Sequence, residues 1–280
     1  MTRSFDWTGP IGDMWAAEWR RTDRSFADLV PHLDAAILAA APAGPFRAID
    51  LGTGAGATAL ALADARRDAD VLGVDLSTAL IDVAKARAHG IGNLRFQVGD
   101  ALAIVGTASP ADLYCSRHGV MFYDDPVAAF TALSAASNPD ARLVFSCFAD
   151  RNANRWAVEP AMALGGAAET ATDTQPGPFA FANPDHVAAI LTEAGWTAAA
   201  PQRVAFDYIA GEGEDSVAEA VAFFTRIGPA ASLLRDAPDR TKATAALATA
   251  LAARRVGNRV AFQAVAWIWS ATRSAGASRP

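Results

Sequence analysis

Three closely spaced glycines near residue 50 are placed so that a bound ligand could approach the backbone. They are Gly52, Gly54 and Gly56, and Asp50 lies two residues before the first of them. A glycine-rich turn between a strand and a helix admits a ligand closely and presents free amide groups at the start of the helix. The spacing differs from Gly-x-Gly-x-x-Gly, the pattern that favours a dinucleotide pyrophosphate. The loop alone therefore indicates either a nucleoside-bearing ligand or an ordinary tight turn.

Two further acids follow the next two apolar segments. Asp75 comes 23 residues after Gly52, and Asp100 follows a third apolar segment. A carboxylate at the place of Asp75 can accept both hydroxyl hydrogens of a ribose, and helix capping is the simpler alternative. Asp100 can accept a hydrogen from an adenine amino group, or it forms an ordinary Gly-Asp turn. Together with Asp50, these acids predict an adenosine site at one edge of a sheet.

The elements that must position these residues alternate between strand and helix. Ser77 is the expected N-cap of the helix after the second strand. Alternation of this kind predicts a parallel α/β sheet with helices on both faces. The expected strands are 47–51, 71–76, 94–98, 112–116, 143–148, 204–209 and 259–270, the expected helical segments are 12–42, 57–67, 78–88, 126–137, 184–194 and 214–256, and 151–182 is expected to be an irregular insertion.

Several stretches of the sequence carry a resemblance to a known family. They are Ala48–Gly56, Gly73–Ser77, Val98–Ala101, Ser116–Pro126 and, further along, Pro178–Pro184. They resemble the class I S-adenosylmethionine (SAM)-dependent methyltransferases, and within that class the UbiE-like group of bacteria. One departure is the segment 138–141, Asn-Pro-Asp-Ala, where the family usually carries a Pro-Gly-Gly turn. We expect it to alter only a surface turn.

The resemblance implies a Rossmann-like, doubly wound sheet of seven strands in the order 3-2-1-4-5-7-6, with the last strand antiparallel. It also implies one methyltransferase domain over residues 1–280. Within that domain we expect an N-terminal helical lid at 1–45, a SAM-binding core at 46–150, cap insertions at 151–182 and 211–257, segments completing the sheet at 183–210 and 258–273, and a disordered tail at 274–280.

The same resemblance implies which residues hold SAM. Arg117 either anchors the cofactor carboxylate or pairs with a surface acid. Trp15 and Trp19, four residues apart on one expected helix, either cover the site or pack in the core. The implied cofactor-binding residues are Asp50, Gly52, Thr53, Gly54, Gly56, Asp75, Leu76, Asp100, Ala101, Ser116, Arg117, Trp15 and Trp19.

Candidates for the chemistry itself follow the fourth strand. His118 is the first candidate for a general base, and Tyr123 is the second. For each residue, packing is the alternative role. His118, for example, could pack beside the cofactor and shape the site without accepting a proton. The aromatic residues of the two insertions suit a small apolar or aromatic methyl acceptor, and they are Trp156, Phe179, Phe181, Phe223 and Phe224.

Two other functions fit parts of the same pattern. A nicotinamide-dependent oxidoreductase uses a similar sheet, but Asp50, the glycine spacing and the lack of a Tyr-x-x-x-Lys pair disfavour it. A SAM-binding protein without catalytic activity would keep the same cofactor motifs. The expected reaction is methyl transfer by in-line displacement, which releases S-adenosylhomocysteine.

Composition narrows the partners and the location that we expect. Charged residues make up 19% of the 280 residues and the net charge is −6, which disfavours nucleic acid as a partner. Cys115 and Cys147 lie in apolar runs and are expected to be reduced core thiols. No metal is expected, because the four histidines are far apart. We expect a cytoplasmic monomer or homodimer without a membrane span.

Overall fold

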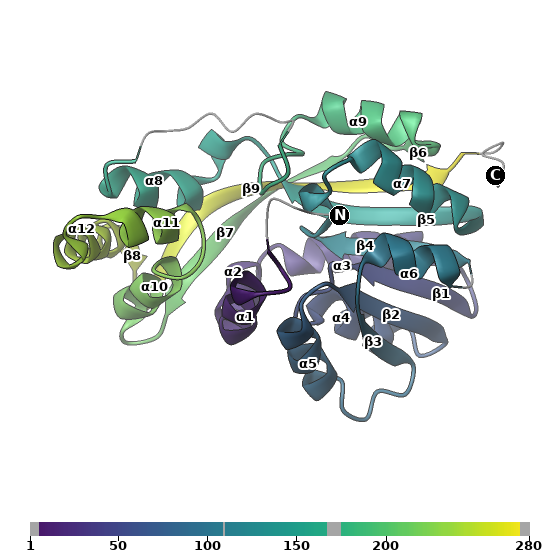
Figure 1. The fold of residues 1–280 in the computed structure, drawn as a ribbon, viewed down its shortest axis with the longest axis horizontal. Helices are drawn as coiled ribbons and strands as arrows, with labels where there is room; N and C mark the ends of the chain where they lie inside the picture. The colour runs from purple at the N-terminus through teal and green to yellow at the C-terminus, as the bar shows by residue number, and fades with distance from the viewer. Residues whose placement is uncertain (1–5, 109, 167–174, 275–280) are drawn as a thin grey trace.

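Five parallel strands form the centre of the computed structural model, which describes residues 6–108, 110–166 and 175–274 (Figure 1). Their side chains are largely buried, as expected for strands covered by helices on both faces. The strands are β1 (Phe46–Leu51), β2 (Ala69–Asp75), β3 (Leu94–Val98), β4 (Ala111–Arg117) and β5 (Ser137–Phe148).

The remaining strands pair through one long strand, β9 (Arg259–Arg273), which runs antiparallel to β5. The order is β3-β2-β1-β4-β5-β9-β6, so the predicted order with an antiparallel last strand is confirmed. The expected single strand at 204–209 is instead the inner part of β7 (Gln202–Glu212), preceded by the short β6 (Trp196–Ala198). With the two-residue β8 (Arg255–Val256), the described residues form a sheet of nine strands.

Helices cover both faces of this sheet. On one face α3 (Val30–Ala40) contacts α4 (Ala57–Ala65), and α5 (Thr78–Arg87) packs on β2 and β3. Ser77 caps α5 as expected, because its Oγ accepts a hydrogen bond from the amide of Leu80 at 3.2 Å. Along the other face α6, α7 and α9 contact one another in turn. They span Ala101–Thr107, Pro126–Ala135 and Pro184–Glu193, and α6 was not expected from the sequence.

The N-terminal segment is not the continuous helix expected at 12–42. It divides into α1 (Pro10–Ala17), α2 (Trp19–Ser25) and α3, with non-helical backbone at Glu18 and at Phe26. The breaks turn α1 toward α5 and α2 toward β7. The N-terminal helices therefore reach two separate parts of the molecule.

A group of helices gathers beside the far end of β7 and β9, away from β3 (Figure 1). Here α8 packs on α11 and α12, and α10 packs on α12 and β7. The insertion at 151–182 is thus less irregular than expected, because it begins with a 3-10 turn at Arg151–Ala153 and then α8; part of it lies outside the described residues. The cap helices are α8 (Arg155–Ala163), α10 (Ser216–Phe224), α11 (Pro229–Asp236) and α12 (Arg240–Ala252).

Other expectations concern the core, a turn and the surface. Cys115 and Cys147 are free and buried, as predicted. The expected surface turn at 138–141 lies within β5, where Asp140 has a positive φ of 62°.

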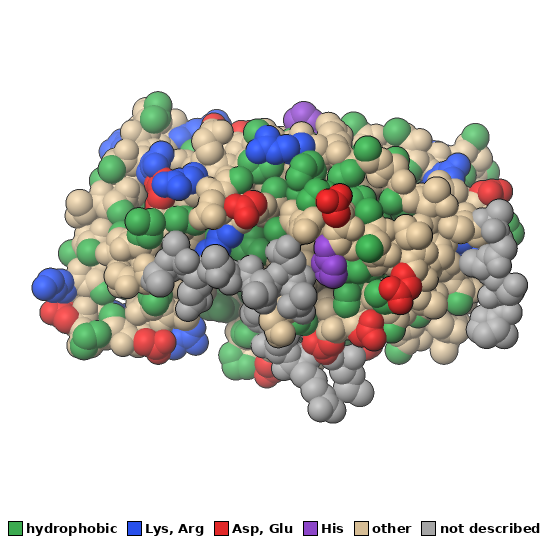
Figure 2. Space-filling view, turned by 90° about the horizontal axis from the view of Figure 1, so that it is seen from above, with side chains coloured by type: hydrophobic (Ala, Val, Ile, Leu, Met, Phe, Trp, Pro, Cys, Tyr) green, Lys and Arg blue, Asp and Glu red, His purple; other side chains and the backbone are tan. Residues whose placement is uncertain are grey.

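Within the described residues, no single helix is long and apolar enough to cross a membrane, although the bent pair α10 and α11 passes that test jointly. Figure 2 shows acidic and basic side chains interspersed on the face above α9. The expected disordered tail lies almost wholly outside the described residues.

A buried asparagine joins the end of β5 to β9 and to the cap. Asn154 is fully buried, and its Nδ2 donates to the carbonyl oxygens of Ala149 at 3.2 Å, Asp150 at 3.0 Å and Val265 at 3.1 Å. Its Oδ1 accepts from the amide of Val265 at 3.1 Å and from Trp156 Nε1 at 3.3 Å. One side chain thus satisfies polar groups from three segments of the chain.

We expect Asn154→Ala to lower the free energy of unfolding by about 3 kcal/mol or more, because each buried polar group left without a partner costs about 1 to 3 kcal/mol. Urea denaturation followed by circular dichroism measures the change. The control is Asn152→Ala, two residues earlier and exposed. Equal stability of the two variants would contradict the role given to Asn154.

Candidate functional site

The glycine loop after β1 is shaped by packing at two of its positions and is open at the third. All three glycines have positive φ, at 62°, 55° and 84° for Gly52, Gly54 and Gly56. A Cβ at Gly52 would lie 3.1 Å from Gly119 Cα, and one at Gly56 would lie 2.7 Å from Phe96 Cζ. A Cβ at Gly54 would meet nothing within 4 Å. The loop therefore leaves room for a ligand at Gly54.

Asp50 lies near the end of β1 and is hydrogen-bonded to the glycine loop. Its side chain is buried, and its Oδ2 accepts a 2.6 Å hydrogen bond from Thr53 Oγ1. Burial raises the pKa of Asp50 to about 7, while the Thr53 hydrogen bond and the nearby charge of Arg117 act in the opposite direction. Asp50 and Thr53 thus position the loop, and their expected contact with the cofactor stays a prediction.

Asp75 joins the glycine loop to the loop after β2. Its Oδ2 accepts from the amide of Gly54 at 2.8 Å, and its Oδ1 accepts from the amide of Ser77 at 2.9 Å. Burial raises the pKa of Asp75, and these two backbone hydrogen bonds oppose that shift. Each carboxylate oxygen has a second lone pair, so Asp75 can still accept hydrogen bonds from two ribose hydroxyls. The adjacent Leu76 is only partly buried at the same strand end.

Asp100 caps a helix, whereas the alternative predicted for it was an ordinary Gly-Asp turn. Its Oδ1 accepts from the amide of Leu102 at 2.8 Å and that of Ala103 at 3.4 Å, which caps α6 at Ala101. Both bonds use the same oxygen, so Oδ2 stays available for an adenine amino group. Capping and ligand binding are therefore compatible at Asp100.

The loop after β4 is tied to the end of β1. Ser116 is buried, and its Oγ donates to the carbonyl of Leu51 at 2.7 Å and accepts from the amide of Gly119 at 3.1 Å. A Cβ at Gly119 would lie 2.7 Å from that same carbonyl, so the two loops lie in contact. Ser116 is engaged in holding the loops together, and its expected contact with the cofactor stays a prediction.

Arg117 pairs with an acid, as one of its two alternatives supposed. Its Nη2 lies 2.7 Å from Asp23 Oδ1, while its Nη1 is buried without a hydrogen-bond partner among the described residues. Asp23 lies on α2, and its Oδ2 also pairs with Arg87 Nη2 at 2.8 Å. The sequence did not single out Asp23, because 94 residues separate it from Arg117.

His118 has properties that oppose a role as a general base. It has a positive φ of 62°, it is buried, and Ser146 Oγ lies 2.9 Å from its Nδ1. Burial, and then the charge of Arg117, lower the pKa of His118 to about 3. The ring is therefore neutral at physiological pH and is a weak proton acceptor. Its Nε2 is buried without a partner among the described residues.

Tyr123 is held by packing, because its ring lies edge-on to Phe130 with ring centroids 6.1 Å apart. Burial raises the pKa of Tyr123, so its phenol keeps its proton. This packing favours the structural alternative, and its catalytic role stays a prediction.

Trp15 and Trp19 lie on α1 and α2, two helices rather than one. Both are partly buried and pack against the small cluster formed by Ala16, Ala55 of the glycine loop and Leu80 of α5. They therefore lie on the side of the sheet where the cofactor was expected.

These residues fit SAM. The open space at Gly54 and the acceptors of Asp75 and Asp100 suit an adenosine, and the unpartnered Nη1 of Arg117 suits a carboxylate. Among the described residues no cluster of His, Cys, Asp and Glu could hold a metal ion.

Comparison with known proteins agrees with this geometry. Residues 48–140 match the family described as a methyltransferase domain. A segment of 56 residues is 50% identical to a release factor glutamine methyltransferase of Xylella fastidiosa, which is 19% of this chain and 20% of that protein. The chain thus matches about a fifth of the length of this curated relative.

Two solved structures show the fold. A putative methyltransferase of Bacillus halodurans aligns with a TM-score of 0.57 at 15% identity, over 87% of this chain and 99% of that one. A phosphoethanolamine N-methyltransferase of Haemonchus contortus, in complex with S-adenosylhomocysteine, aligns with a TM-score of 0.51 at 16% identity, over 93% of this chain and 56% of that one.

The strand order defines a Rossmann-like sheet, and the residues at the edge of that sheet fit SAM. The methyltransferase domain matched at residues 48–140 and the shared fold support a class I SAM-dependent methyltransferase, with SAM as the cofactor that the site fits.

We expect Asp75→Asn to weaken SAM binding at least tenfold, because a charge-assisted hydrogen bond is worth about 1.5 to 3 kcal/mol. Isothermal titration calorimetry measures the dissociation constant. The control is Asp70→Asn on the same strand, where Asp70 forms only an exposed ion pair with Arg95. If Asp75→Asn folds normally and binds SAM as the wild type does, the ribose assignment is wrong.

Proposed function

We propose that this protein transfers the methyl group of SAM to a small apolar or aromatic molecule and releases S-adenosylhomocysteine. The observation that carries the proposal is a line of aromatic rings that begins at the end of β4 and continues into the cap. We call this the aromatic wall, and it consists of Phe26, His118, Phe148, Trp156 and Tyr208.

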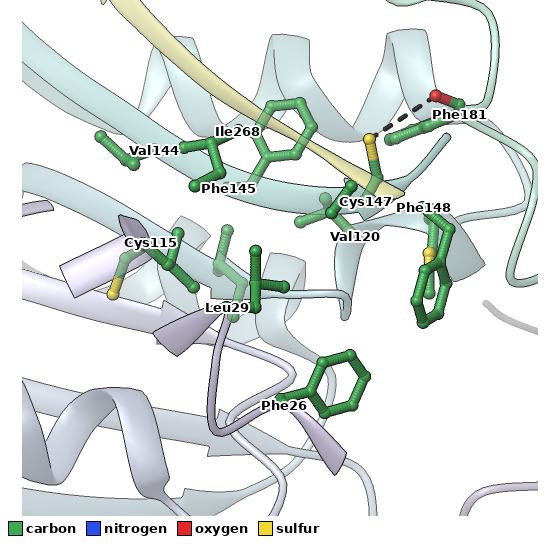
Figure 3. Packing of buried hydrophobic residues seen from close by; sticks show 14 of the residues in the cluster. Phe26, Leu29, Cys115, Val120, Val144, Phe145, Cys147, Phe148, Phe181 and Ile268 are labelled. Atoms are coloured by element: carbon green, nitrogen blue, oxygen red, sulfur yellow. Dashed lines mark hydrogen bonds between the residues drawn. The ribbon is translucent and has the colours of Figure 1, made fainter. Parts of the chain in front are cut away.

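The rings of the aromatic wall lie in continuous contact. His118 lies 4.9 Å from Phe26 and 4.2 Å from Phe148, measured between ring centroids. Phe148 then lies 4.9 Å from Trp156, which stacks on Tyr208 at 4.8 Å with an interplanar angle of 15°. Figure 3 shows Phe26 and Phe148 reaching toward each other from separate segments. A flat apolar acceptor would pack well against rings of this kind.

Three of the five aromatic residues expected to line the acceptor site lie at or near this wall. Trp156 belongs to the wall itself. Phe179 stacks on Trp156 with ring centroids 6.1 Å apart, and Phe223 stacks on Tyr208 with ring centroids 6.4 Å apart. Two others pack elsewhere: Phe181 lies against Phe130 and Phe145, and Phe224 lies against Phe223 and Phe262. Residues on β5, β7 and α8 therefore supply the wall together with the loop after β4 and with Phe26 at the end of α2.

SAM brings a methyl group that its positively charged sulfur already activates. In the transfer, an electron pair of the acceptor forms the new bond to the methyl carbon, and the electrons of the carbon–sulfur bond go to sulfur. Alignment of the reactants can supply about 7 to 11 kcal/mol in such a step. The protein's part is then to hold the acceptor in line and to exclude water, which the buried aromatic wall suits.

His118 contributes to this alignment as a neutral ring. Its low pKa leaves it unprotonated, and its unpartnered Nε2 can bind a polar group of the acceptor. If the nucleophilic atom of the acceptor carries a proton, that proton is lost to water. An acceptor without such a proton needs no base. Membership of the UbiE-like branch agrees with the stretch Ser116–Pro126 and stays part of the proposal.

A screen with isotopically labelled SAM tests the function. Purified protein is incubated with panels of phenols, quinols, aromatic amines and small carboxylic acids, and labelled product is measured after extraction. We expect product with an aromatic or apolar acceptor, and at least tenfold less with the Asp75→Asn protein at a SAM concentration below the wild-type dissociation constant. A protein that binds SAM but labels no member of any panel would support the alternative of a non-catalytic SAM-binding protein.

With an acceptor in hand, we expect His118→Phe to lower kcat less than tenfold, because Phe keeps the packing and a ring with a pKa of about 3 is not the base. The rise in KM should exceed the loss in kcat, since Nε2 binds the acceptor. Steady-state kinetics between pH 6 and pH 9 measure both. A loss in kcat of about 100-fold or more would restore His118 as the general base.

A further inference from the structure

One acidic side chain of the N-terminal segment lies between two arginines at the cofactor site. Asp23 Oδ1 lies 2.7 Å from Arg117 Nη2, and Asp23 Oδ2 lies 2.8 Å from Arg87 Nη2. All three side chains are largely shielded from solvent, with 13 to 22% of their surface exposed. A carboxylate held by two guanidinium groups accepts charge-assisted hydrogen bonds from both of them.

The two arginines come from the parts of the fold that surround the cofactor. Arg87, the last residue of α5, donates from Nη1 to the carbonyl of Ala55 in the glycine loop at 2.7 Å. Arg117 ends β4, and its charge is close enough to lower the pKa of the buried Asp50. The Asp23 carboxylate therefore lies across the edge of the sheet where β1 and β4 end.

The arginines have contacts that hold them in place without Asp23. Arg87 lies over the ring of Trp19, with 4.1 Å from its Cζ to the ring centroid, and Arg117 lies over Phe26 at 5.3 Å. Arg117 Nη1 is buried and has no partner among the described residues, so its guanidinium still has a donor to offer. The pair of arginines forms a preformed site for a carboxylate.

The helix that carries Asp23 is anchored independently. Arg21 makes two hydrogen bonds to Glu219 of α10, at 2.9 and 3.0 Å. Glu18 is buried and pairs with Arg21 at 2.7 Å and with Arg226 at 2.9 Å. These bonds can hold α2 on the cap while the Asp23 side chain alone turns away from the arginines.

We propose that Asp23 is an internal competitor for the cofactor, and that the carboxylate of SAM's methionine part takes its place between Arg87 and Arg117. Any carboxylate there must displace Asp23, so the ion pair lowers the apparent affinity for SAM. The proposal requires that SAM binds, and it is independent of which molecule accepts the methyl group.

Two ligands that differ in this carboxylate provide the test. S-adenosylhomocysteine carries the amino acid group, and 5′-deoxy-5′-methylthioadenosine has the same adenosine and sulfur without it. By calorimetry, we expect Asp23→Asn to bind S-adenosylhomocysteine about threefold to tenfold more tightly than the wild type, since the ion pair is partly exposed and of moderate strength. Affinity for methylthioadenosine should stay unchanged.

Matched variants complete the experiment. Asp13→Asn removes an exposed acid of α1 and should change neither affinity. Arg117→Gln should weaken S-adenosylhomocysteine and leave methylthioadenosine unchanged, and thermal unfolding of each variant verifies that it is folded.

Three results would overturn the proposal. Unchanged affinity of Asp23→Asn for S-adenosylhomocysteine would show no competition, and weaker binding would indicate that Asp23 holds the cofactor's amino group instead. Equal shifts for both ligands would point to a general effect of the N-terminal segment. If the wild type binds neither ligand, the cofactor assignment itself fails, which is a separate result from a failed methyl-transfer screen.

Discussion

The pairing of β9 is the constraint on which the rest of the molecule depends. Its C-terminal half pairs with β5 from Thr272 to Ala266, and its N-terminal half pairs with β7 from Ile268 to Arg259. The cap is therefore joined to the sheet by backbone hydrogen bonds at the point where β5 ends. A register shift of one residue would turn every side chain of β9 to the opposite face. Because β9 pairs with both β5 and β7, it also sets the position of Tyr208 relative to Phe148.

Buried polar groups stabilise that junction. Phe148 ends β5 beside Trp156 of α8, and Asn154 between them binds backbone groups of β9. The aromatic wall is assembled here because the chain leaves the sheet at β5 and returns along β7 and β9. The same pairing brings α10 beside α2, where Glu219 binds Arg21. Helix α2 thus contacts both the expected cofactor site and the cap.

Much of the cofactor side was predictable from the sequence. Glycines at close spacing, with Asp50, Asp75 and Asp100 at successive strand ends, are local patterns, and the rule that parallel strands end at one edge converts them into a site. The helix α6 was missed although Asp100 caps it, because an N-cap and a Gly-Asp turn begin with the same residues. The breaks at Glu18 and Phe26 were missed because each depends on what the helices pack against.

The ion pairs of Asp23 could not be predicted from the sequence, because they too depend on tertiary packing. Asp23, Arg87 and Arg117 belong to three elements separated by 64 and 94 residues, and no spacing rule connects them. The same holds for His118, whose low pKa comes from burial by Phe26 and Phe148 and from the charge of Arg117.

From the sequence alone, local periodicity and turn chemistry predicted a parallel α/β sheet and the glycine loop, and the family resemblance implied the strand order and SAM as the cofactor. The tertiary structure alone decided that His118 is neutral, that Asp23 occupies the arginine pair and that five distant rings form one wall. Burial and long-range ion pairing depend on which surfaces meet, and that information arises only when the chain is folded.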